Sequence, residues 1–382
     1  MAALPTPITP LDQLLNLDDF ERSAEATLKP KSWAYYASSA DNGQTYRESA
    51  SIWNEVRFRP RVMRDVGGEV DLRTTIGGCE TSVPLMISPA AMGKLAHKDG
   101  ELSLAKAAGR SNIVYCPSNH ASVSHKDLIS AAPPSTPFFF QLYTHRERWR
   151  SAKQLAEAKQ MGFKAVVVTV DVPVPGNREL DLRTGLDANA VELANPGMKV
   201  GERVLAAAAT SVTIDASQSW KDLAWIKEAS GGLPLWIKGI HTVEDALLAY
   251  EHGAAGIYLS SHGGRQVNTA PTTLEMLLEL RLHAPHLLSS PTFSVVVDGG
   301  IRRGTDAVKA LCLGATAVSL GRPFMFSLVY GQEGPQRVVE IMRDEMERCL
   351  RLLGVRSVGE LRPEMVNTRR VERRFFGEGS KL

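Results

Sequence analysis

Short apolar runs alternate with longer amphipathic segments from about residue 83 onward. Each run is nearly continuous in apolar residues, as expected for strands buried on both faces of a parallel sheet. The segments at 146–161, 242–252 and 306–313 place their apolar residues on one helical face. Because the strand-helix unit repeats, the pattern predicts an α/β fold, the closed (β/α)8 or TIM barrel. The predicted strands are 83–88, 113–116, 138–142, 165–170, 235–238, 256–260, 294–297 and 317–320.

Two segments depart from this alternation. The N-terminal one begins helix-like at 11–28 and then turns to strand-like alternation, with Gly67-Gly68 and Gly77-Gly78 as turns, which predicts a helical and hairpin extension acting as a lid or plug. Residues 182–219, rich in Ala, Gly, Asn and Thr, predict a long loop after the fourth strand. We expect a single domain over 1–382, made of an N-terminal extension (1–82), a barrel (83–330) and a C-terminal helical segment with a tail (331–382).

Charge and composition exclude several classes of function. The 44 Lys and Arg residues nearly balance 42 Asp and Glu residues, leaving a net charge of +2 that does not suggest a nucleic-acid partner. No apolar run approaches the ~20 residues needed to cross a bilayer, so we expect no membrane partner. The four cysteines match neither a zinc site nor a short disulfide framework, which favours a reduced compartment and no metal: Cys79, Cys116, Cys312 and Cys349.

The chain ends in Ser380, Lys381 and Leu382. This tripeptide is the peroxisomal address read by an import receptor. The N-terminus does not have the pattern of a secretory signal. We therefore expect a peroxisomal protein that binds the peroxisomal import receptor.

In a (β/α)8 barrel the reactive residues follow the strands, and polar groups follow most of the predicted strands here. After strands seven and eight come Gly300 with Arg302, and Gly321 with Arg322. Glycines let backbone N–H groups approach an anion, and arginines add charge-assisted hydrogen bonds. These two pairs together predict a phosphate site.

Residues at the ends of three further strands suggest acid-base catalysis on a substrate that carries a carboxylate. His262 follows strand six and Asp171 follows strand four, which is a general-base arrangement in which the carboxylate orients the imidazole. Arg178 and Arg265 together match the geometry of a substrate carboxylate. Lys238, at the end of strand five, fits either a Schiff base or a cation that stabilises negative charge on a cofactor. The neighbouring phosphate site favours the cofactor role.

Over nearly its whole length the sequence resembles the FMN-dependent L-2-hydroxy acid oxidases and dehydrogenases, the family of glycolate oxidase and lactate oxidase. The motifs that carry this resemblance are Tyr35-Tyr36-Ala37-Ser38, Pro89-Ala90-Ala91-Met92, Gln141-Leu142-Tyr143, Thr169-Val170-Asp171, Lys238-Gly239, His262-Gly263-Gly264-Arg265-Gln266, Asp298-Gly299-Gly300-Ile301-Arg302 and Gly321-Arg322-Pro323.

The resemblance implies FMN as the cofactor. Its phosphate would rest on Gly300, Arg302, Gly321 and Arg322. The residues implied to line its ring are Pro89, Ala90, Ala91, Ser118, Gln141 and Thr169. Asp298 would hold the ribityl chain, and Lys238 would stabilise the reduced ring.

The resemblance also implies an FMN-dependent (S)-2-hydroxy acid oxidase that yields a 2-oxo acid. His262 would remove the hydroxyl proton while the α-hydrogen passes to the flavin as hydride, and a carbanion route through the same base stays open. Tyr143 would face the substrate hydroxyl, and Asp171 would stabilise the imidazolium. The residues implied to grip the substrate carboxylate are Tyr35, Arg178 and Arg265.

Three departures from the family pattern concern the site. His120 stands where glycolate oxidase has a Trp facing the substrate side chain, which predicts a polar, partly basic wall that prefers a polar or acidic side chain. Ser261 precedes His262 where the family usually has Asn, and Asn268 replaces the usual Asp beyond the Gln. We expect these two changes to alter local hydrogen bonding only.

The electron acceptor is expected to be dioxygen, giving hydrogen peroxide. Ala91 is the residue usual in oxidases beside the flavin, whereas glycine there accompanies lactate monooxygenases, and no haem domain precedes the barrel in this sequence. A lactate 2-monooxygenase-type or dehydrogenase-type member, a Schiff-base aldolase and a silent flavin-binding protein remain alternatives. Family members form tetramers or octamers, so we expect a homotetramer or homo-octamer.

Overall fold

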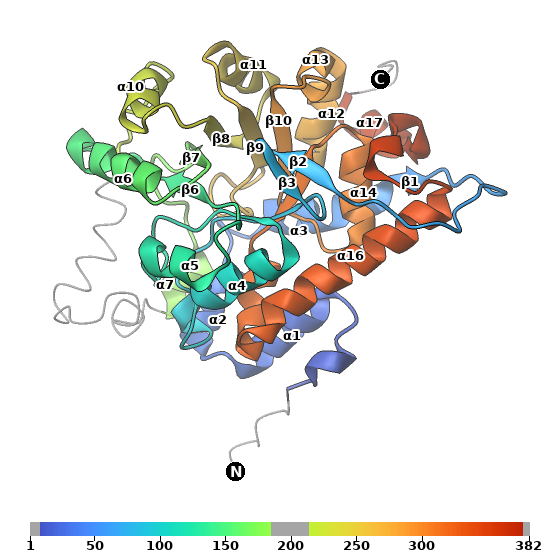
Figure 1. Ribbon diagram of the computed structural model, residues 1–382, viewed down its shortest axis with the longest axis horizontal. Helices are drawn as coiled ribbons and strands as arrows, with labels where there is room; N and C mark the ends of the chain where they lie inside the picture. Colours follow the sequence, from blue (N-terminus) through green and yellow to red (C-terminus); the bar gives the residue numbers. More distant parts are fainter. Residues whose placement is uncertain (1–7, 185–213, 377–382) are drawn as a thin grey trace.

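The structure, a computed structural model, describes residues 8–184 and 214–376. Most of the predicted loop at 182–219 and the C-terminal Ser380, Lys381 and Leu382 lie outside the described residues. Within the described part, eight parallel strands surrounded by helices form the (β/α)8 barrel that the sequence pattern predicts (Figure 1).

The barrel closes between its second and third strands. The strands follow the order β5-β4-β11-β10-β9-β8-β7-β6. The two ends of this order meet where Tyr115 bridges Phe138 and where its N–H donates to the Pro137 carbonyl at 3.0 Å. All eight predicted strands are confirmed, with bounds β4 Leu85–Ile87, β5 Val114–Tyr115, β6 Phe139–Leu142, β7 Ala165–Thr169, β8 Leu235–Ile240, β9 Gly256–Ser260, β10 Ser294–Asp298 and β11 Ala317–Leu320.

The barrel wall buries apolar side chains on both faces. Val167 of β7 packs in the barrel interior with Trp236 and Tyr258 of the next two strands. Its neighbours Val166 and Val168 belong to the outer core between the strands and the helices. Burial on both faces explains why the strands are continuous apolar runs, because each apolar side chain contributes roughly 25 cal/mol per Å² removed from water.

Helices cover the outside of the barrel (Figure 1). Thr242 and Thr272 begin α11 and α12, each accepting a hydrogen bond from a free N–H of the first turn. The predicted helices correspond to α6, α11 and α14, and the long α16 packs against α4 and α14. The bounds are α4 Glu101–Ser111, α5 His125–Ala131, α6 Arg148–Gln160, α7 Glu179–Thr184, α10 Asp222–Ala229, α11 Val243–Glu251, α12 Thr273–His283, α13 Pro285–Leu288, α14 Gly304–Cys312, α15 Arg322–Ser327 and α16 Glu333–Leu353.

The N-terminal extension is more helical than the sequence pattern predicts. The expected strand-like alternation after residue 28 is wrong for α2 (Pro30–Ala37) and α3 (Gln44–Ser51). Pro30 suits the first position of a helix, which favours the start of α2. Because α2 buries one face against α7 and α15, tertiary packing overrides the strand preference of its aromatic residues. Before them lie the short turn Leu11–Gln13 and α1 (Leu17–Thr27), and after them the turn Ile52–Glu55.

A β-hairpin closes the N-terminal end of the barrel. Strands β2 (Thr74–Ile76) and β3 (Cys79–Thr81) are joined by the predicted Gly77-Gly78 turn, in which both residues have positive φ. Ile76 packs with the interior residues of the barrel. A Cβ at Gly77 would come within 2.7 Å of the Phe139 ring, so only glycine fits this approach. Figure 1 shows the hairpin over the middle of the ring of strands.

The C-terminal segment ties the extension to the barrel. β1 (Arg57–Phe58) pairs with β12 (Val366–Asn367), and α17 (Arg369–Phe376) follows. Short turns at Gly93–Leu95, Leu328–Tyr330, Val358–Glu360 and Pro363–Met365 complete the described elements. Among the helices in the described ranges, none combines the length and apolar character required to cross a membrane.

Candidate active site

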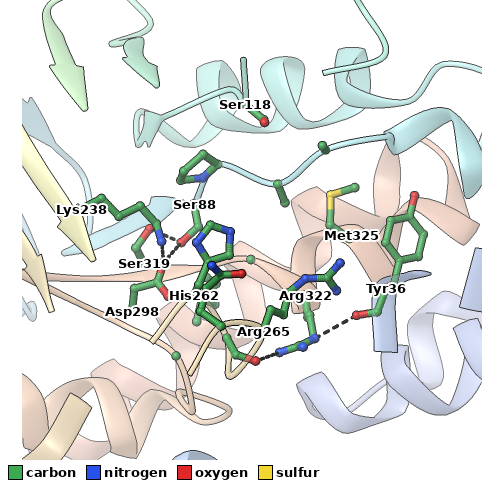
Figure 2. A pocket seen from close by; sticks show the side chains of 18 of the residues that line it. Tyr36, Ser88, Ser118, Lys238, His262, Arg265, Asp298, Ser319, Arg322 and Met325 are labelled. Carbon is green, nitrogen blue, oxygen red and sulfur yellow. Dashed lines mark hydrogen bonds and ion pairs between the residues drawn. The ribbon is translucent and has the colours of Figure 1, made fainter. Parts of the chain in front are cut away.

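A cavity of about 560 Å³ opens where the barrel strands end, the face that carries the active site in enzymes of this fold. Loops after the strands form most of its wall, and side chains of α2 and α3 complete it. Figure 2 shows Lys238 on one side of His262, and Arg265 and Arg322 on the other.

Most of the predicted site residues line this cavity. Gln141, Thr169 and Asp171 do not, because their side chains are buried behind its wall. The predicted residues that line it are Tyr35, Pro89, Ala90, Ala91, Ser118, His120, Tyr143, Arg178, Lys238, His262, Arg265, Asp298, Gly300, Arg302, Gly321 and Arg322.

His262 and Asp171 form a hydrogen-bonded pair. Nδ1 of His262 lies 2.9 Å from Oδ1 of Asp171, whose side chain is 3% exposed. Burial raises the pKa of Asp171, but the charges of His262, Lys238 and His241 and the hydrogen bond of His262 together lower that pKa below its usual value. Because an ionised carboxylate only accepts hydrogen bonds, Nδ1 carries a proton, and Nε2 is the ring nitrogen that faces Tyr143 in the cavity.

The backbone at His262 has an unusual conformation. His262 has a φ of 53°, and Gly263 and Gly264 follow with φ of 66° and 69°. Positive φ is costly for a histidine and persists where the surrounding structure imposes it, as at functional sites. The turn is fixed by the His262 N–H, which donates to the Ser260 hydroxyl at 3.1 Å.

Tyr143 and His120 lie beside this pair. The Tyr143 hydroxyl is 3.5 Å from Nε2 of His262, and burial raises the pKa of Tyr143 above its usual value, so the phenol stays protonated. The His120 ring stacks on Tyr143 with centroids 5.1 Å apart. Burial lowers the pKa of His120 to about 4, so the partly basic wall expected from the sequence is neutral at physiological pH.

Arg178 and Arg265 flank the ring of Tyr35, at 5.8 Å and 5.3 Å from its centroid. Arg178 also pairs with Asp181 at 3.2 Å. Arg265 donates to the Tyr35 carbonyl at 2.8 Å and to Ser38. Burial, and then the charge of Arg178, lower the pKa of Arg265 to about 9. A buried cation with a lowered pKa is stabilised by an anion, so this corner of the cavity favours a carboxylate.

Arg302 and Arg322 lie at the other end of the cavity. Arg322 donates to the carbonyls of Tyr36, Gly263 and Ser38 and makes no ion pair within 8–184 and 214–376. Arg302 lies 2.7 Å from Glu21 and donates to the Tyr46 hydroxyl at 2.8 Å.

Two features at this end were not predicted from the sequence. Tyr46 of α3 orients both arginines, because the Arg322 guanidinium also stacks over its ring at 4.3 Å. Gly300 has a φ of 79°, and a Cβ there would clash with the Ser49 carbonyl, so only glycine brings the turn this close to α3.

Lys238 sits in a network of hydroxyl groups at the bottom of the cavity. Its Nζ donates to Ser260 Oγ at 2.9 Å and lies 3.9 Å from Asp298 Oδ2. Asp298 also accepts from Ser88 at 2.7 Å, and Ser88 contacts Ser319 at 2.7 Å (Figure 2). From the sequence alone, these three serines are not identified as site residues. Their only signal there is a lone hydroxyl residue within or at the end of an apolar strand.

Behind the wall, Gln141 links two loops of the site. Its Nε2 donates to the Thr169 hydroxyl at 3.1 Å, and its Oε1 accepts from the Asn119 N–H at 2.8 Å. Of the two departures near His262, Asn268 accepts from the Thr45 N–H at 3.2 Å, and the buried Ser261 hydroxyl has no partner in the described part of the chain.

Residues 24–368 match the family described as FMN-dependent dehydrogenase. The chain belongs to this family. It is 39% identical over 94% of its length to mouse (Mus musculus) 2-hydroxyacid oxidase 2, covering 99% of that protein. It is 38% identical over 91% of its length to spinach (Spinacia oleracea) glycolate oxidase, covering 94% of that protein.

Other members of the FMN-dependent dehydrogenase family are longer. L-lactate dehydrogenase (cytochrome) from Wickerhamomyces anomalus is 39% identical over 96% of this chain, which spans 63% of that protein. A flavocytochrome b2 variant with pyruvate bound has a TM-score of 0.86 and 36% identity, with 98% of this chain and 91% of that chain covered. The resemblance seen in the sequence is thus confirmed at the level of the family and its fold.

FMN is the cofactor of this family, and the cavity fits it. Arg322 supplies a buried positive charge that no described carboxylate neutralises, beside the close-approach turn at Gly300. Lys238 supplies a second buried cation among the hydroxyl groups at the bottom of the cavity. The site at Arg322 and Gly300 suits a phosphate, and the buried cation at Lys238 suits a ring that becomes negatively charged when it accepts electrons.

Proposed function

We propose that this protein oxidises an L-2-hydroxy acid to the 2-oxo acid with bound FMN and passes the electrons to dioxygen, which gives hydrogen peroxide. The observation that carries this proposal is the hydrogen-bonded pair of His262 and Asp171 in a cavity that also presents Arg178, Arg265 and the buried Lys238. A base, an anion clamp and a cofactor-stabilising cation are the three elements that this oxidation requires.

The substrate carboxylate binds between Arg178 and Arg265, with Tyr35 beside them. Arg265 forms no ion pair with the described residues, and burial lowers its pKa, which supports this role because a bound carboxylate would raise that pKa again. The substrate hydroxyl then faces Nε2 of His262 and the Tyr143 hydroxyl, which lie 3.5 Å apart. Held this way, the hydroxyl is within reach of the base.

His262 accepts the hydroxyl proton at Nε2, and Asp171 stabilises the resulting imidazolium through Nδ1. When bound, FMN supplies the acceptor for the two electrons that leave the substrate carbon. Tyr143 donates a hydrogen bond to the substrate oxygen because its own proton is held tightly.

The residues proposed to hold FMN are those predicted from the sequence. Its phosphate is held by Gly300, Arg302, Gly321 and Arg322, and Asp298 binds the ribityl chain. Lys238 stays cationic, which its contacts with Ser260 and Asp298 support over a Schiff-base role. Of the residues predicted to line the ring, Pro89, Ala90, Ala91 and Ser118 line the cavity and are proposed to contact the ring. Gln141 and Thr169 are proposed to support this wall from behind, through the hydrogen bonds of Gln141 to Asn119 and Thr169.

Two relatives support dioxygen as the electron acceptor, because the mouse and spinach proteins, 39% and 38% identical to this chain, are named oxidases. Ala91 lines the cavity, and we propose that it lies beside the ring, where alanine is the residue usual in oxidases. We assign the protein to the peroxisome through the tripeptide Ser380-Lys381-Leu382. We also propose a homotetramer or homo-octamer, because members of the family form tetramers or octamers.

The proposal is tested by turnover of purified, FMN-loaded protein with glycolate, L-lactate and longer L-2-hydroxy acids in air. We expect stoichiometric peroxide and 2-oxo acid, and no reaction with D-isomers. Release of acetate and carbon dioxide from L-lactate would instead identify a monooxygenase. Turnover with cytochrome c or a quinone but not with dioxygen would identify a dehydrogenase.

A further inference from the structure

The cavity wall beside the reacting centre is polar in this chain. Asn119 and His120, from the loop after β5, both line the cavity. His120 stacks nearly parallel on Tyr143, with an interplanar angle of 17°. Since the Tyr143 hydroxyl lies 3.5 Å from the His262 base, His120 is one ring removed from the place where the substrate hydroxyl binds.

The His120 ring has no partner for its nitrogens. Its backbone N–H donates to the Ser118 hydroxyl at 3.1 Å, which fixes the loop, but its imidazole makes no hydrogen bond to any residue in the described ranges. Burial lowers its pKa to about 4, and no carboxylate opposes this. The ring is therefore a neutral imidazole that offers one donor and one acceptor to the cavity.

The position of His120 relates it to one substituent of the substrate. With the carboxylate at Arg178 and Arg265 and the hydroxyl at His262 and Tyr143, the remaining carbon substituent extends along the adjacent wall. An apolar group there leaves the imidazole unsatisfied, and a carboxylate beside this neutral ring finds a hydrogen-bond donor but no opposite charge. An uncharged hydroxyl satisfies it without either cost.

Resting on the proposed function, we propose that the preferred substrate carries an uncharged hydrogen-bonding group on C3, as in a 2,3-dihydroxy acid, and that His120 is the specificity-determining residue that receives it. Of the polar and acidic side chains predicted from the sequence, the wall thus selects the uncharged polar one.

The test compares two substrates of equal size, L-glycerate and L-2-hydroxybutyrate, which differ by a hydroxyl in place of a methyl on C3. In the wild-type holoenzyme we expect kcat/KM to be about tenfold higher for L-glycerate, in line with one hydrogen bond to a buried group. L-malate, with a carboxylate on C3, is expected to be poorer than both.

The diagnostic variant is His120→Phe, which keeps the aromatic stack on Tyr143 and removes both nitrogens. We expect it to lose about tenfold in kcat/KM for L-glycerate and less than about threefold for L-2-hydroxybutyrate. His120→Gln, which restores a neutral donor and acceptor, should recover part of the preference. His252→Phe is the matched control, because the His252 ring packs at a tilt against Trp220 outside the cavity, so its replacement should leave the ratio unchanged.

An unchanged ratio in His120→Phe, or a wild-type preference for L-2-hydroxybutyrate or L-malate, overturns the inference while the proposed function stands. If no hydroxy acid reduces the flavin, the proposed function itself fails and the inference with it. The wild-type ratio alone decides the matter if His120→Phe does not fold.

Discussion

Asp171→Asn tests the role of the buried carboxylate most cleanly, because it keeps the shape of the side chain and removes its charge. The carboxylate oxygen lies 2.9 Å from Nδ1 of His262, and the side chain is 3% exposed. Two opposite charges about 4 Å apart attract by about 4 kcal/mol at an effective dielectric constant of about 20. That attraction arises only when His262 becomes an imidazolium during the reaction.

Losing this attraction raises the barrier of the proton-transfer step. At 1.36 kcal/mol per factor of ten, about 4 kcal/mol corresponds to a fall of up to about a thousandfold in the rate of flavin reduction. We expect a fall of about 10²- to 10³-fold in kcat with little change in KM, because Asp171 does not touch the bound substrate.

The assay is anaerobic stopped-flow reduction of the FMN-loaded variant by a saturating L-2-hydroxy acid. Asp222→Asn is the matched control, since Asp222 is also buried but pairs with Arg148 outside the cavity, and it should leave the rate unchanged. A rate for Asp171→Asn within about threefold of the wild type would refute the reasoning.

The same substitution has a signed effect on stability. The folded-state pKa of Asp171 is lowered from its usual 3.8, so its ionised form stabilises the fold above that value. This contribution is lost as the pH falls through the lowered pKa. The stability difference between wild type and Asp171→Asn should therefore be constant near neutral pH and shrink below about pH 4, measured by denaturant unfolding.

Three further predictions follow from the other charged and close-packed groups of the site. Gly300→Ala should lose FMN and more than about 2 kcal/mol of stability. Gly78 has a similar φ, but a Cβ added there would meet no atom within 4 Å, so Gly78→Ala should cost about 1 kcal/mol and retain FMN. Equal losses in the two variants would contradict the argument that a Cβ at Gly300 clashes. Lys238→Met should slow flavin reduction by about a hundredfold, while Lys309→Met, a buried lysine outside the cavity, should affect only thermal stability; a fast Lys238→Met enzyme would remove the proposed role of this cation. In the substrate-free enzyme the pKa of Arg265 is lowered to about 9, so kcat/KM should fall above that pH. The kcat should stay level, because a bound carboxylate raises the pKa of Arg265 in the enzyme–substrate complex. A kcat/KM that does not change with pH would count against the role of Arg265 in binding the substrate carboxylate.

The barrel is predictable from the sequence because its signal is local and repeated. Eight apolar runs that alternate with helices are typical of a closed parallel barrel buried on both faces, and polar groups at their ends converge on one face. The pairing of His262 with Asp171 follows from this rule, although the two residues are far apart in the chain. Catalytic residues that follow the strands of a barrel can therefore be predicted from the sequence alone.

Other parts of the site depend on tertiary contacts and are not predictable in this way. Helix α3 has weak helical signals of its own, so the role of Tyr46 between two arginines appears only once the extension is packed on the barrel. Ser88 and Ser319 are distant in sequence and meet only because β4 and β11 are neighbours. The neutral state of His120 depends on its burial, which the sequence does not encode locally.

Anaerobic titration of the purified yellow protein with L-2-hydroxy acids tests the central claim most directly. The account predicts stoichiometric bleaching of the visible flavin band, its return with peroxide when air is readmitted, and loss of the bleaching in His262→Asn with FMN still bound. A flavin-containing protein that no L-2-hydroxy acid reduces, or a His262→Asn variant that bleaches at the wild-type rate, would contradict it.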